Sequence, residues 1–360
     1  MAILKLIISG ILALAQILSP VMAYVSNFGE SKFFDEWSAT DAFTKDSYIE
    51  IKKDPNKDFV ILNLADVQLE DGELYAELGV ESMAMIDKLV EETKPDLITL
   101  TGDNAWGTMA YIELIKQLDS YGIPWAPVMG NHDGQGCISE FWAAYLLSEA
   151  ENCLFEFGPE DMGYGNYIIN VTENGKIIHT LFMLDTHNNR YYTAEDGSTY
   201  RDYDHLWSNQ IEWYKWAVNG ITAMAGKTVE STVFMHIPVY EYRTAWKNNF
   251  GSSELGTLDS SLAPEAQGDN GEGIYSAPEN NGFFAVCKEL GSTKNMIAGH
   301  DHVNNFQIYH EGIRLTYALK TGYGCYYTKD LLGATTVTIG SDGAAFAEHH
   351  YLESTLPQDK

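Results

Sequence analysis

The sequence predicts an α/β domain with a parallel sheet. Three short apolar runs, at 59–65, 96–101 and 125–129, have the length and composition of buried strands. Apolar residues at helical spacing, at 78–89 and at 110–121, separate these runs. Strands that alternate with helices pair in parallel, and the carboxyl ends of parallel strands meet at one edge of the sheet.

The second half of the chain continues this pattern less regularly. We expect a hairpin pair at 167–171 and 177–184, strands at 232–235 and 295–298, and helices at 207–223 and 281–290. Residues 241–282 are rich in Gly, Asn, Ser and acidic side chains, which predicts a long loop insertion. From 306 to 348 the pattern predicts successive strands, with turns at 311–312 and 341–343.

The first residues of the chain have the features of a signal peptide. Lys5 lies in a short positive region, an apolar run extends from Leu6 to Leu18, and Val21-Met22-Ala23 fits the small-x-small rule for cleavage. The apolar run is short for a bilayer span, which needs about 20 residues. We therefore expect a secreted or periplasmic protein, with an uncleaved anchor outside the cytoplasm as the alternative.

The rest of the chain contains no Gly-, Ser- or Pro-rich linker, so one domain is expected. The predicted organisation is a signal peptide at 1–23, an irregular N-terminal arm at 24–57 and the folded domain at 58–353. Export makes disulfides possible. Cys137 and Cys153 would close a short loop, whereas Cys287 and Cys325 either pair or remain thiols.

The formal net charge of −29 limits the classes of partner. A surface this acidic repels nucleic-acid backbones and anionic membranes, so we expect neither a nucleic-acid duplex nor a membrane as partner. A small anionic substrate would need a local source of positive charge. Bound metal ions supply such charge without adding Lys or Arg residues.

Five polar clusters follow the apolar runs in order along the chain. They are Asp66-x-Gln68, Gly102-Asp103, Gly130-Asn131-His132-Asp133, His236 and Gly299-His300-x-His302. Each alone is typical of a turn or of a hydrogen-bonded core histidine. Five in series at strand ends instead indicate a metal centre, and imidazole with oxygen ligands suits Mn, Zn, Fe or Co. Two cations about 3.5–4 Å apart need a bridging carboxylate, and Asp103 is the candidate.

The five clusters resemble the calcineurin-like metallophosphoesterase superfamily, whose pattern is D-x-H, GD, GNH[DE], H and GHxH. The resemblance extends over residues 59 to 305. It implies a four-layer α/β/β/α sandwich, in which two mixed β-sheets are flanked by helices. It also implies a phosphohydrolase, monoesterase or diesterase, in which water activated by two divalent ions attacks phosphorus. The alternatives are a nucleotide pyrophosphatase or phosphodiesterase, and a degenerate member that binds metal or phosphate without turnover.

The resemblance also implies roles for individual residues. The ligands of the first metal would be Asp66, Gln68, Asp103 and His302. The ligands of the second metal would be Asp103, Asn131, His236 and His300. His132 would protonate the leaving-group oxygen or stabilise charge on the phosphate. Asp133 would orient His132 through its other ring nitrogen, or would serve only as a turn or cap residue.

The chain departs from the family pattern at two positions. Gln68 stands where His is usual, and its hard amide oxygen would favour Mn or Mg over Zn, so Mn is the expected metal, with Zn, Fe, Mg or Co as alternatives. Glutamine here also resembles a subset that acts on pyrophosphate links in nucleotide derivatives. Asp185 and Gln210-x-x-Trp213 resemble the purple-acid-phosphatase-like branch. Trp106 replaces the iron-binding Tyr of that branch, so a colourless protein is expected.

The expected substrate is a small phosphorylated compound. Aromatic side chains between the clusters would stack on a base or sugar, or would only pack long loops. They are Tyr191, Tyr192, Tyr200, Tyr203, Trp246 and Phe250. The candidate phosphate contacts are Arg190, Arg201 and Arg243. Among the remaining histidines, His187 is the one candidate for a functional role.

Overall fold

The computed structural model describes residues 30–250, 255–257 and 265–356. The predicted signal peptide at 1–23 therefore lies outside the described residues. The helices within them are α2 (Glu77–Thr93), α3 (Thr108–Ser120), α4 (Glu140–Ser148), α5 (Ser208–Ala225), α6 (Glu241–Phe250) and α7 (Phe283–Leu290). No helix of the described part is long and apolar enough to cross a membrane.

The first sheet contains the predicted parallel strands. Its order is β18-β17-β2-β4-β6. The bounds are β2 (Phe59–Leu64), β4 (Leu97–Thr101), β6 (Trp125–Val128), β17 (Gly333–Ile339) and β18 (Ala345–Tyr351). Strands β2, β4 and β6 pair in parallel, while β17 is antiparallel to both β2 and β18. The predicted strand–helix alternation of the first half is confirmed.

The second sheet is also mixed, with the order β1-β7-β8-β11-β14-β16-β15. The bounds are β1 (Ile49–Lys52), β7 (Tyr167–Glu173), β8 (Lys176–Met183), β11 (Ser231–Met235), β14 (Thr293–Ala298), β15 (Gln307–His310) and β16 (Ile313–Tyr317). Strands β7 and β8 form the predicted hairpin, and β8, β11, β14 and β16 are parallel.

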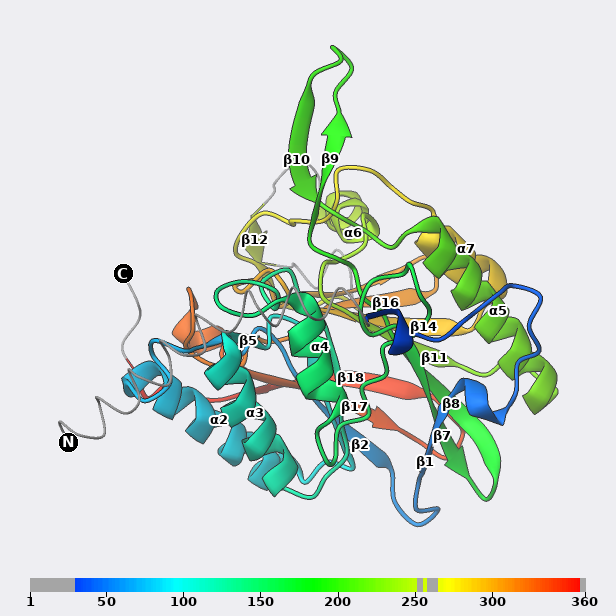
Figure 1. Cartoon of the computed structure of the whole chain (residues 1–360), viewed down its shortest axis with the longest axis horizontal. Coiled ribbons are helices and arrows are strands. Elements are labelled where there is room, and N and C mark those ends of the chain that lie inside the picture. Colours follow the sequence, from blue (N-terminus) through cyan, green and yellow to red (C-terminus); the bar gives the residue numbers. More distant parts are fainter. Residues whose placement is uncertain (1–29, 251–254, 258–264, 357–360) are drawn as a thin grey trace.

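Alternate residues of the second sheet face two different cores. Leu181 and Phe234 belong to the core that also contains Ile61 of the first sheet. Their neighbours Phe182 and Val233 belong to the core that contains residues of α5 and α7. Because side chains alternate across a strand, the second sheet lies between the first sheet and these helices. Helices α2 and α3 lie on the opposite side of the molecule (Figure 1), which completes the predicted four-layer sandwich.

Two irregular segments predicted from the sequence contain regular structure instead. The N-terminal arm contributes β1, which pairs in parallel with β7, because Ile49 and Ile51 alternate with polar residues and continue the sheet edge. The predicted loop insertion at 241–282 begins with α6. Tyr242 and Trp246 of this helix are buried four residues apart, and this spacing places both on one helical face.

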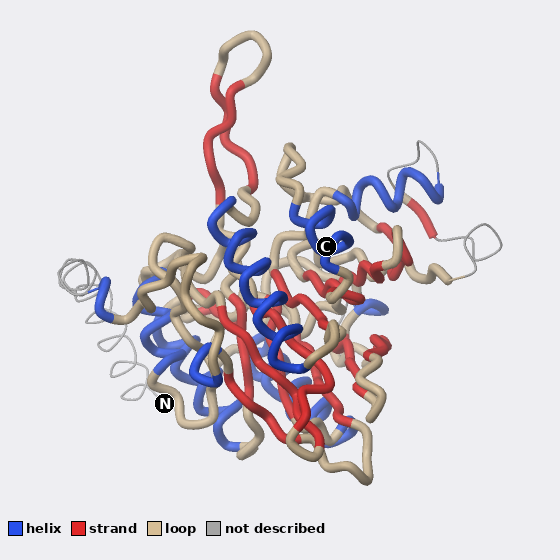
Figure 2. Tube along the Cα trace, turned by 90° about the vertical axis from the view of Figure 1, so that its right-hand side faces the viewer, coloured by secondary structure: helices blue, strands red, loops and turns tan. Residues whose placement is uncertain are grey.

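Three small two-stranded sheets complete the described strands. They pair β3 (Leu69–Glu70) with β5 (Ala105–Trp106), β9 (Asn189–Thr193) with β10 (Thr199–Tyr203), and β12 (Gly256–Thr257) with β13 (Asp269–Asn270). The β9–β10 hairpin projects from the body of the molecule, as both views show (Figure 1 and Figure 2). The sequence analysis did not predict this hairpin.

The cysteines are free thiols, so the suggested Cys137–Cys153 bridge is not formed. Cys153 is fixed beside β6 by a bridge to Trp125, and burial raises the pKa of its thiol. Cys137 lies instead in the loop that follows the third polar cluster, where its carbonyl accepts from Thr108. Cys287 is buried in α7, whereas Cys325 is exposed.

Buried His179 of β8 links the fold to pH. Its Nδ1 lies 2.8 Å from the Gly343 carbonyl and its Nε2 3.0 Å from the Thr232 hydroxyl. Burial lowers the pKa of His179 from 6.5 to about 4. Below pH 6.5 the unfolded chain therefore binds a proton that the folded chain excludes, and stability falls as the pH drops toward 4.

We expect His179→Gln to remove this pH dependence. The variant is less stable than the parent at pH 7.5, but the difference in free energy of unfolding shrinks by up to roughly 3 kcal/mol toward pH 4. Urea unfolding at a series of pH values measures this difference. Parallel stability curves for the two proteins between pH 6.5 and 4 would contradict the assignment.

Candidate metal centre

The five predicted clusters meet between the two sheets. Asp66 and Asp103 follow β2 and β4 of the first sheet, and His236 follows β11 of the second. All three are buried, and they offer ligand atoms that lie within 4.8 Å of one another. Carboxyl ends of strands from both sheets thus supply one group of metal-capable side chains, as the sequence predicted.

Side chains predicted for the second metal lie in direct contact. His236 Nε2 is 2.9 Å from Asn131 Oδ1 and 3.3 Å from Asp103 Oδ1. His300 Nδ1 lies 3.1 Å from the same His236 nitrogen. The other nitrogen of His236 faces the Thr101 carbonyl at 2.9 Å, which fixes the orientation of the ring. This second group therefore comprises Asp103, Asn131, His236 and His300.

Side chains predicted for the first metal border the opposite side of Asp103. His302 Nε2 lies 3.6 Å from Asp66 Oδ1. The Gln68 amide Nε2 donates to Asp103 Oδ2 at 3.0 Å. Asp103 therefore directs one carboxylate oxygen toward His236 and the other toward Gln68. The structure brings together all seven residues that the sequence predicted as metal ligands.

Strained backbone positions hold these side chains. Asp66, Gln68, Asp103 and His300 all have left-handed φ angles, of 52°, 46°, 50° and 80°. Such conformations are rare for residues other than glycine and cluster at functional sites. Gly130 is required for a different reason, because a Cβ atom there would lie 2.2 Å from the Asp103 backbone nitrogen.

Opposing charges determine the protonation of the centre. Burial acts to raise the pKa of Asp66, but His302 and His236 lower it below its usual range. Burial acts in the same direction on Asp103, and His236 again reverses it, so the pKa of Asp103 is lowered. Burial and the charge of His236 lower the pKa of His300 to about 3. The carboxyls are thus anionic and the His300 imidazole is neutral.

The donor set fits divalent cations. His300 Nε2 is buried and has no hydrogen-bond partner among the residues that the structure describes. A neutral imidazole nitrogen without a partner is costly in the interior unless it binds a ligand. Two anionic carboxylates, two amide side chains and three imidazoles are groups that first-row divalent metals accept as ligands.

His132 lies at the rim of the centre, with a side chain that is 33% exposed. Its Nδ1 lies 2.9 Å from Gln135 Oε1, and its Nε2 lies 4.0 Å from Asp103 Oδ2. The Trp106 ring lies 5.2 Å from the imidazole, centroid to centroid. The histidine is therefore oriented by Gln135 and Trp106, with Nε2 directed toward the centre.

The suggested contact between Asp133 and His132 is absent, and the alternative of a turn residue is what the structure contains. Asp133 accepts from the backbone nitrogens of Gly130 at 2.7 Å, Asn104 at 2.7 Å and Ala105 at 3.2 Å. It also accepts from the Asn104 amide and the Tyr111 hydroxyl. His132 is not among these partners, and Asp133 instead ties the second and third clusters together.

Sequence reasoning missed residues that border the centre. Lys320 donates to Gln68, and Tyr326 stacks on His302 with ring centroids 4.2 Å apart. Neither residue belongs to a motif. Tyr203, one of the aromatic candidates, contacts His300 edge-on at 4.4 Å. It reaches the centre from the base of the β9–β10 hairpin.

Several other candidates make their contacts with residues outside the metal-capable cluster. Trp246 is buried against Phe306, and Arg243 donates to the Ser276 carbonyl. His187 stacks on Trp207 and lies 2.8 Å from Gln210 Oε1. Other members of the predicted set lie on the hairpin: Arg190, Tyr191, Tyr192, Tyr200 and Arg201. The side chain of Phe250 lies outside the described residues.

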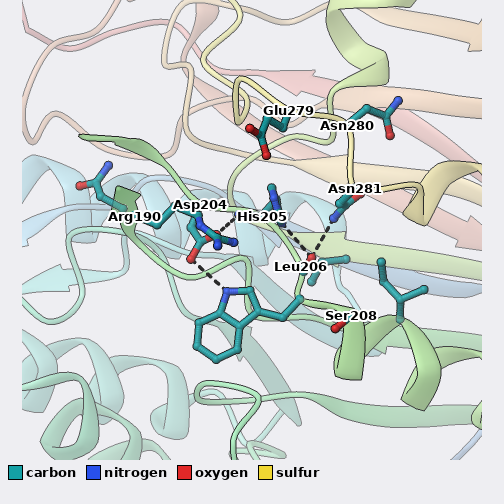
Figure 3. Close-up of a pocket in the computed structure, with 11 residues that line it drawn as sticks. Arg190, Asp204, His205, Leu206, Ser208, Glu279, Asn280 and Asn281 are labelled. Carbon is teal, nitrogen blue, oxygen red and sulfur yellow. Dashed lines mark hydrogen bonds and ion pairs between the residues drawn. The ribbon is translucent and has the colours of Figure 1, made fainter. Parts of the chain in front are cut away.

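A polar cavity of about 750 Å³ lies beside the base of the hairpin. Figure 3 shows Arg190, Asp204 and His205 on its wall, facing Glu279 and Asn281. Asp204 follows Tyr203 directly in sequence, and Tyr203 contacts His300. The segment 203–205 therefore borders both this cavity and the metal-capable cluster.

We expect the Asp133 network to stabilise the fold. Asp133→Ala leaves several buried donors unpaired, and should lower the free energy of unfolding by about 3 kcal/mol or more. Gln135→Ala removes two hydrogen bonds, to His132 and to the Asn131 carbonyl, at a half-buried position where water can replace the lost partners, and should cost less than about 1.5 kcal/mol. Urea unfolding of both variants measures the two values. Equal losses would contradict the role assigned to Asp133.

The chain is similar in sequence to several known proteins. A curated relative from Arabidopsis thaliana, named probable inactive purple acid phosphatase 14, is 28% identical over 273 residues, which cover 69% of this chain and 63% of that protein. Phosphatase DCR2 of Saccharomyces cerevisiae is 26% identical over 273 residues, 69% of this chain and 44% of its own. The chain thus spans less than two thirds of the length of either relative.

The crystal structure of a dimetal phosphatase from Danio rerio has the same fold, with a TM-score of 0.52 and 14% identity over 82% of this chain and 97% of that one. The family model for calcineurin-like phosphoesterases matches residues 59–304, the span that contains all five clusters. This chain therefore belongs to the calcineurin-like phosphoesterase family.

Proposed function

We propose that this chain is an exported phosphohydrolase with two divalent metal ions. One observation carries the proposal: Asp103 Oδ1 lies 3.3 Å from His236, while Oδ2 lies 3.0 Å from Gln68. A carboxylate that faces two groups of metal-capable side chains can bridge two cations, as metal-assisted displacement at phosphorus requires. The family membership and the named phosphatase among the relatives support the same reaction class.

The chain's own residues supply the two positions. Asp66, Gln68, Asp103 and His302 border the first position. Asp103, Asn131, His236 and His300 border the second. When bound, the ions supply a water nucleophile at neutral pH and positive charge for the phosphoryl oxygens. Manganese is the metal we propose, because oxygen ligands form about half of the set.

His132 is the proposed proton donor. Gln135 occupies its Nδ1, which leaves Nε2 free at the rim of the centre. Because Nδ1–H donates to Gln135 Oε1, the donor at Nε2 is the imidazolium form, which carries a proton on both nitrogens. This form would donate the Nε2 proton to the leaving-group oxygen, or a hydrogen bond to the phosphoryl group. Its partial exposure allows it to reach a bound substrate.

A small phosphorylated substrate fits the surroundings. The net charge of −29 disfavours polyanionic partners such as nucleic-acid duplexes. Trp106, Tyr203 and Tyr326 surround the centre and offer aromatic faces or edges to a substrate. We therefore propose two substrate classes, phosphate esters and pyrophosphate-linked nucleotide derivatives. The leader sequence supports export from the cytoplasm.

A second candidate is a protein that binds metal or phosphate without turnover. It is favoured by the relatives named probable inactive purple acid phosphatases. Against it, the seven predicted ligands lie together in one buried cluster with His132 at its rim, and His300 Nε2 has no hydrogen-bond partner among the described residues.

An assay on three substrates distinguishes these functions. We expect the protein loaded with Mn²⁺ to hydrolyse p-nitrophenyl phosphate, bis-p-nitrophenyl phosphate or ADP-ribose, and a chelator to abolish this activity because the nucleophile is lost. Product release in the presence of Mn²⁺ and of chelator measures both effects. Metal-loaded protein inert on all three substrates would favour the second candidate.

Two substitutions separate metal binding from proton donation. Asp103→Asn removes the bridging charge and should abolish both metal binding and hydrolysis. His132→Ala should retain the metal and lower kcat by about 100-fold or more. His350→Ala is the control, because this histidine is paired with Glu92 at the surface. Metal analysis and steady-state kinetics provide the measurements; full activity in His132→Ala would remove this histidine from the mechanism.

A further inference from the structure

A buried lysine lies at the edge of the first metal position. Lys320 is 1% exposed. Its ammonium Nζ donates to the Asp66 backbone carbonyl at 2.6 Å and to Gln68 Oε1 at 3.1 Å. Both acceptors belong to residues that border the first position. No residue of the five clusters predicts a cation here.

The backbone fixes Lys320 in this place. It forms β-bridges with Ala65 on one side and Leu332 on the other. The next residue, Thr321, donates to the Ala65 carbonyl at 2.7 Å, and Gly333 donates to the Lys320 carbonyl at 3.0 Å. Because Ala65 directly precedes Asp66, the lysine is held in register with the first cluster. Its side chain is therefore built into the centre and cannot easily leave.

The lysine determines which way the Gln68 amide faces. Lys320 can only donate, so it selects the amide oxygen, and the amide nitrogen is left to donate to Asp103 Oδ2 at 3.0 Å. Rotation of the amide by half a turn would bring its NH₂ group against the ammonium. The oxygen would then lie against the Asp103 carboxylate. Both contacts would be repulsive, which favours the observed orientation.

We propose that Lys320 holds the Gln68 amide oxygen away from the first metal position. The two positions then bind divalent ions with unequal affinity. The second position takes up the tightly bound ion, and the first position binds the weaker one. The ammonium also repels a cation beside it. At the second position, His300 Nε2 is buried with no hydrogen-bond partner among the described residues, so this ligand atom is free to bind an ion. This inference rests on the proposed two-metal function.

The closing experiment is a calorimetric titration of chelator-stripped full-length protein with MnCl₂. We expect one tight ion and a second that binds at least about tenfold more weakly, since a hydrogen bond to a charged group shifts an equilibrium constant by about that factor. The electron paramagnetic resonance spectrum at one equivalent should be that of an isolated Mn²⁺ ion. Spin coupling between two Mn²⁺ ions should appear only at higher concentrations.

Substitutions at both partners test the cause. Lys320→Met keeps the apolar stem and removes the donors. It should raise the affinity of the weaker ion, at the first position, by about tenfold or more. Gln68→Met should change neither affinity much in the parent chain, because the amide oxygen is not a ligand there. In the Lys320→Met background, Gln68→Met should lower the affinity of the ion at the first position again. This double-mutant cycle reports the coupling of the two residues.

Lys53→Met is the matched control. Lys53 is also buried, but it pairs with Glu173 and Ser341 away from the centre. Its loss should leave the ratio of the two affinities unchanged. If Lys320→Met does not fold, Gln68→Met alone tests the proposal. A clear loss of the ion at the first position would mean that Gln68 is a ligand, and would overturn the proposal.

Failure of this inference is distinguishable from failure of the proposed function. Two ions that bind parent protein with equal affinity would overturn the role of Lys320 and leave the two-metal function intact. If folded Lys320→Met binds the weaker ion with the parent's affinity, the role of Lys320 is likewise overturned and the two-metal function stays intact. No Mn²⁺ binding to parent protein at any position would overturn both.

Discussion

Two buried carboxylates, Asp66 and Asp103, concentrate negative charge where the two sheets meet. Burial by itself would raise the pKa of both and favour their neutral forms. The histidines beside them reverse this effect, since both carboxyl pKa values are lowered and that of His236 is raised. The free-energy cost of desolvating the two anions is thus already met in the folded protein. A cation that binds gains their attraction without that cost arising again.

The same carboxylates join turns that lie far apart in the sequence. The backbone nitrogen of His300 donates to both oxygens of Asp66, and that of His132 donates to Asp103 Oδ1. Each turn includes a residue in a strained conformation or a glycine that no larger residue can replace. Such strain persists only where surrounding contacts over-determine it. The centre is therefore part of what holds the two sheets in register, and its geometry depends on the whole sandwich.

This arrangement explains which features were predictable from the sequence. A strand and the polar residue at its end are adjacent in the chain, so Asp66, Asn131 and His236 carried a local signal. Parallel pairing places the first two at one sheet edge, and the packing of the two sheets brings His236 to them. The helix α6 was missed because the Gly- and Asn-rich residues that follow it obscured its two buried aromatic positions. The edge strand β1 was missed because an isolated four-residue alternation gains meaning only beside β7.

The least predictable residues act through contacts with distant parts of the chain. Asp133 follows His132 directly, which suggested that it orients the histidine, but its oxygens accept from Gly130, Asn104 and Tyr111. Adjacent residues on a turn point in different directions, and spacing alone cannot reveal the direction. Lys320 lies outside every motif, and only its bridge to Ala65 brings it to the centre.

Lys320 also accounts for the departure of the first cluster from the family pattern. A histidine that binds a metal through one nitrogen presents the other as an N–H donor. At position 68 such a donor would face the Lys320 ammonium, which offers donors only. An amide, in contrast, presents an oxygen to the lysine and a nitrogen to Asp103. Gln68, which replaces the usual histidine, and Lys320, 252 residues further along the chain, are thus partners in one hydrogen bond. The glutamine at this position is therefore compatible with the buried charge behind it, whereas a metal-binding histidine would set one donor against another.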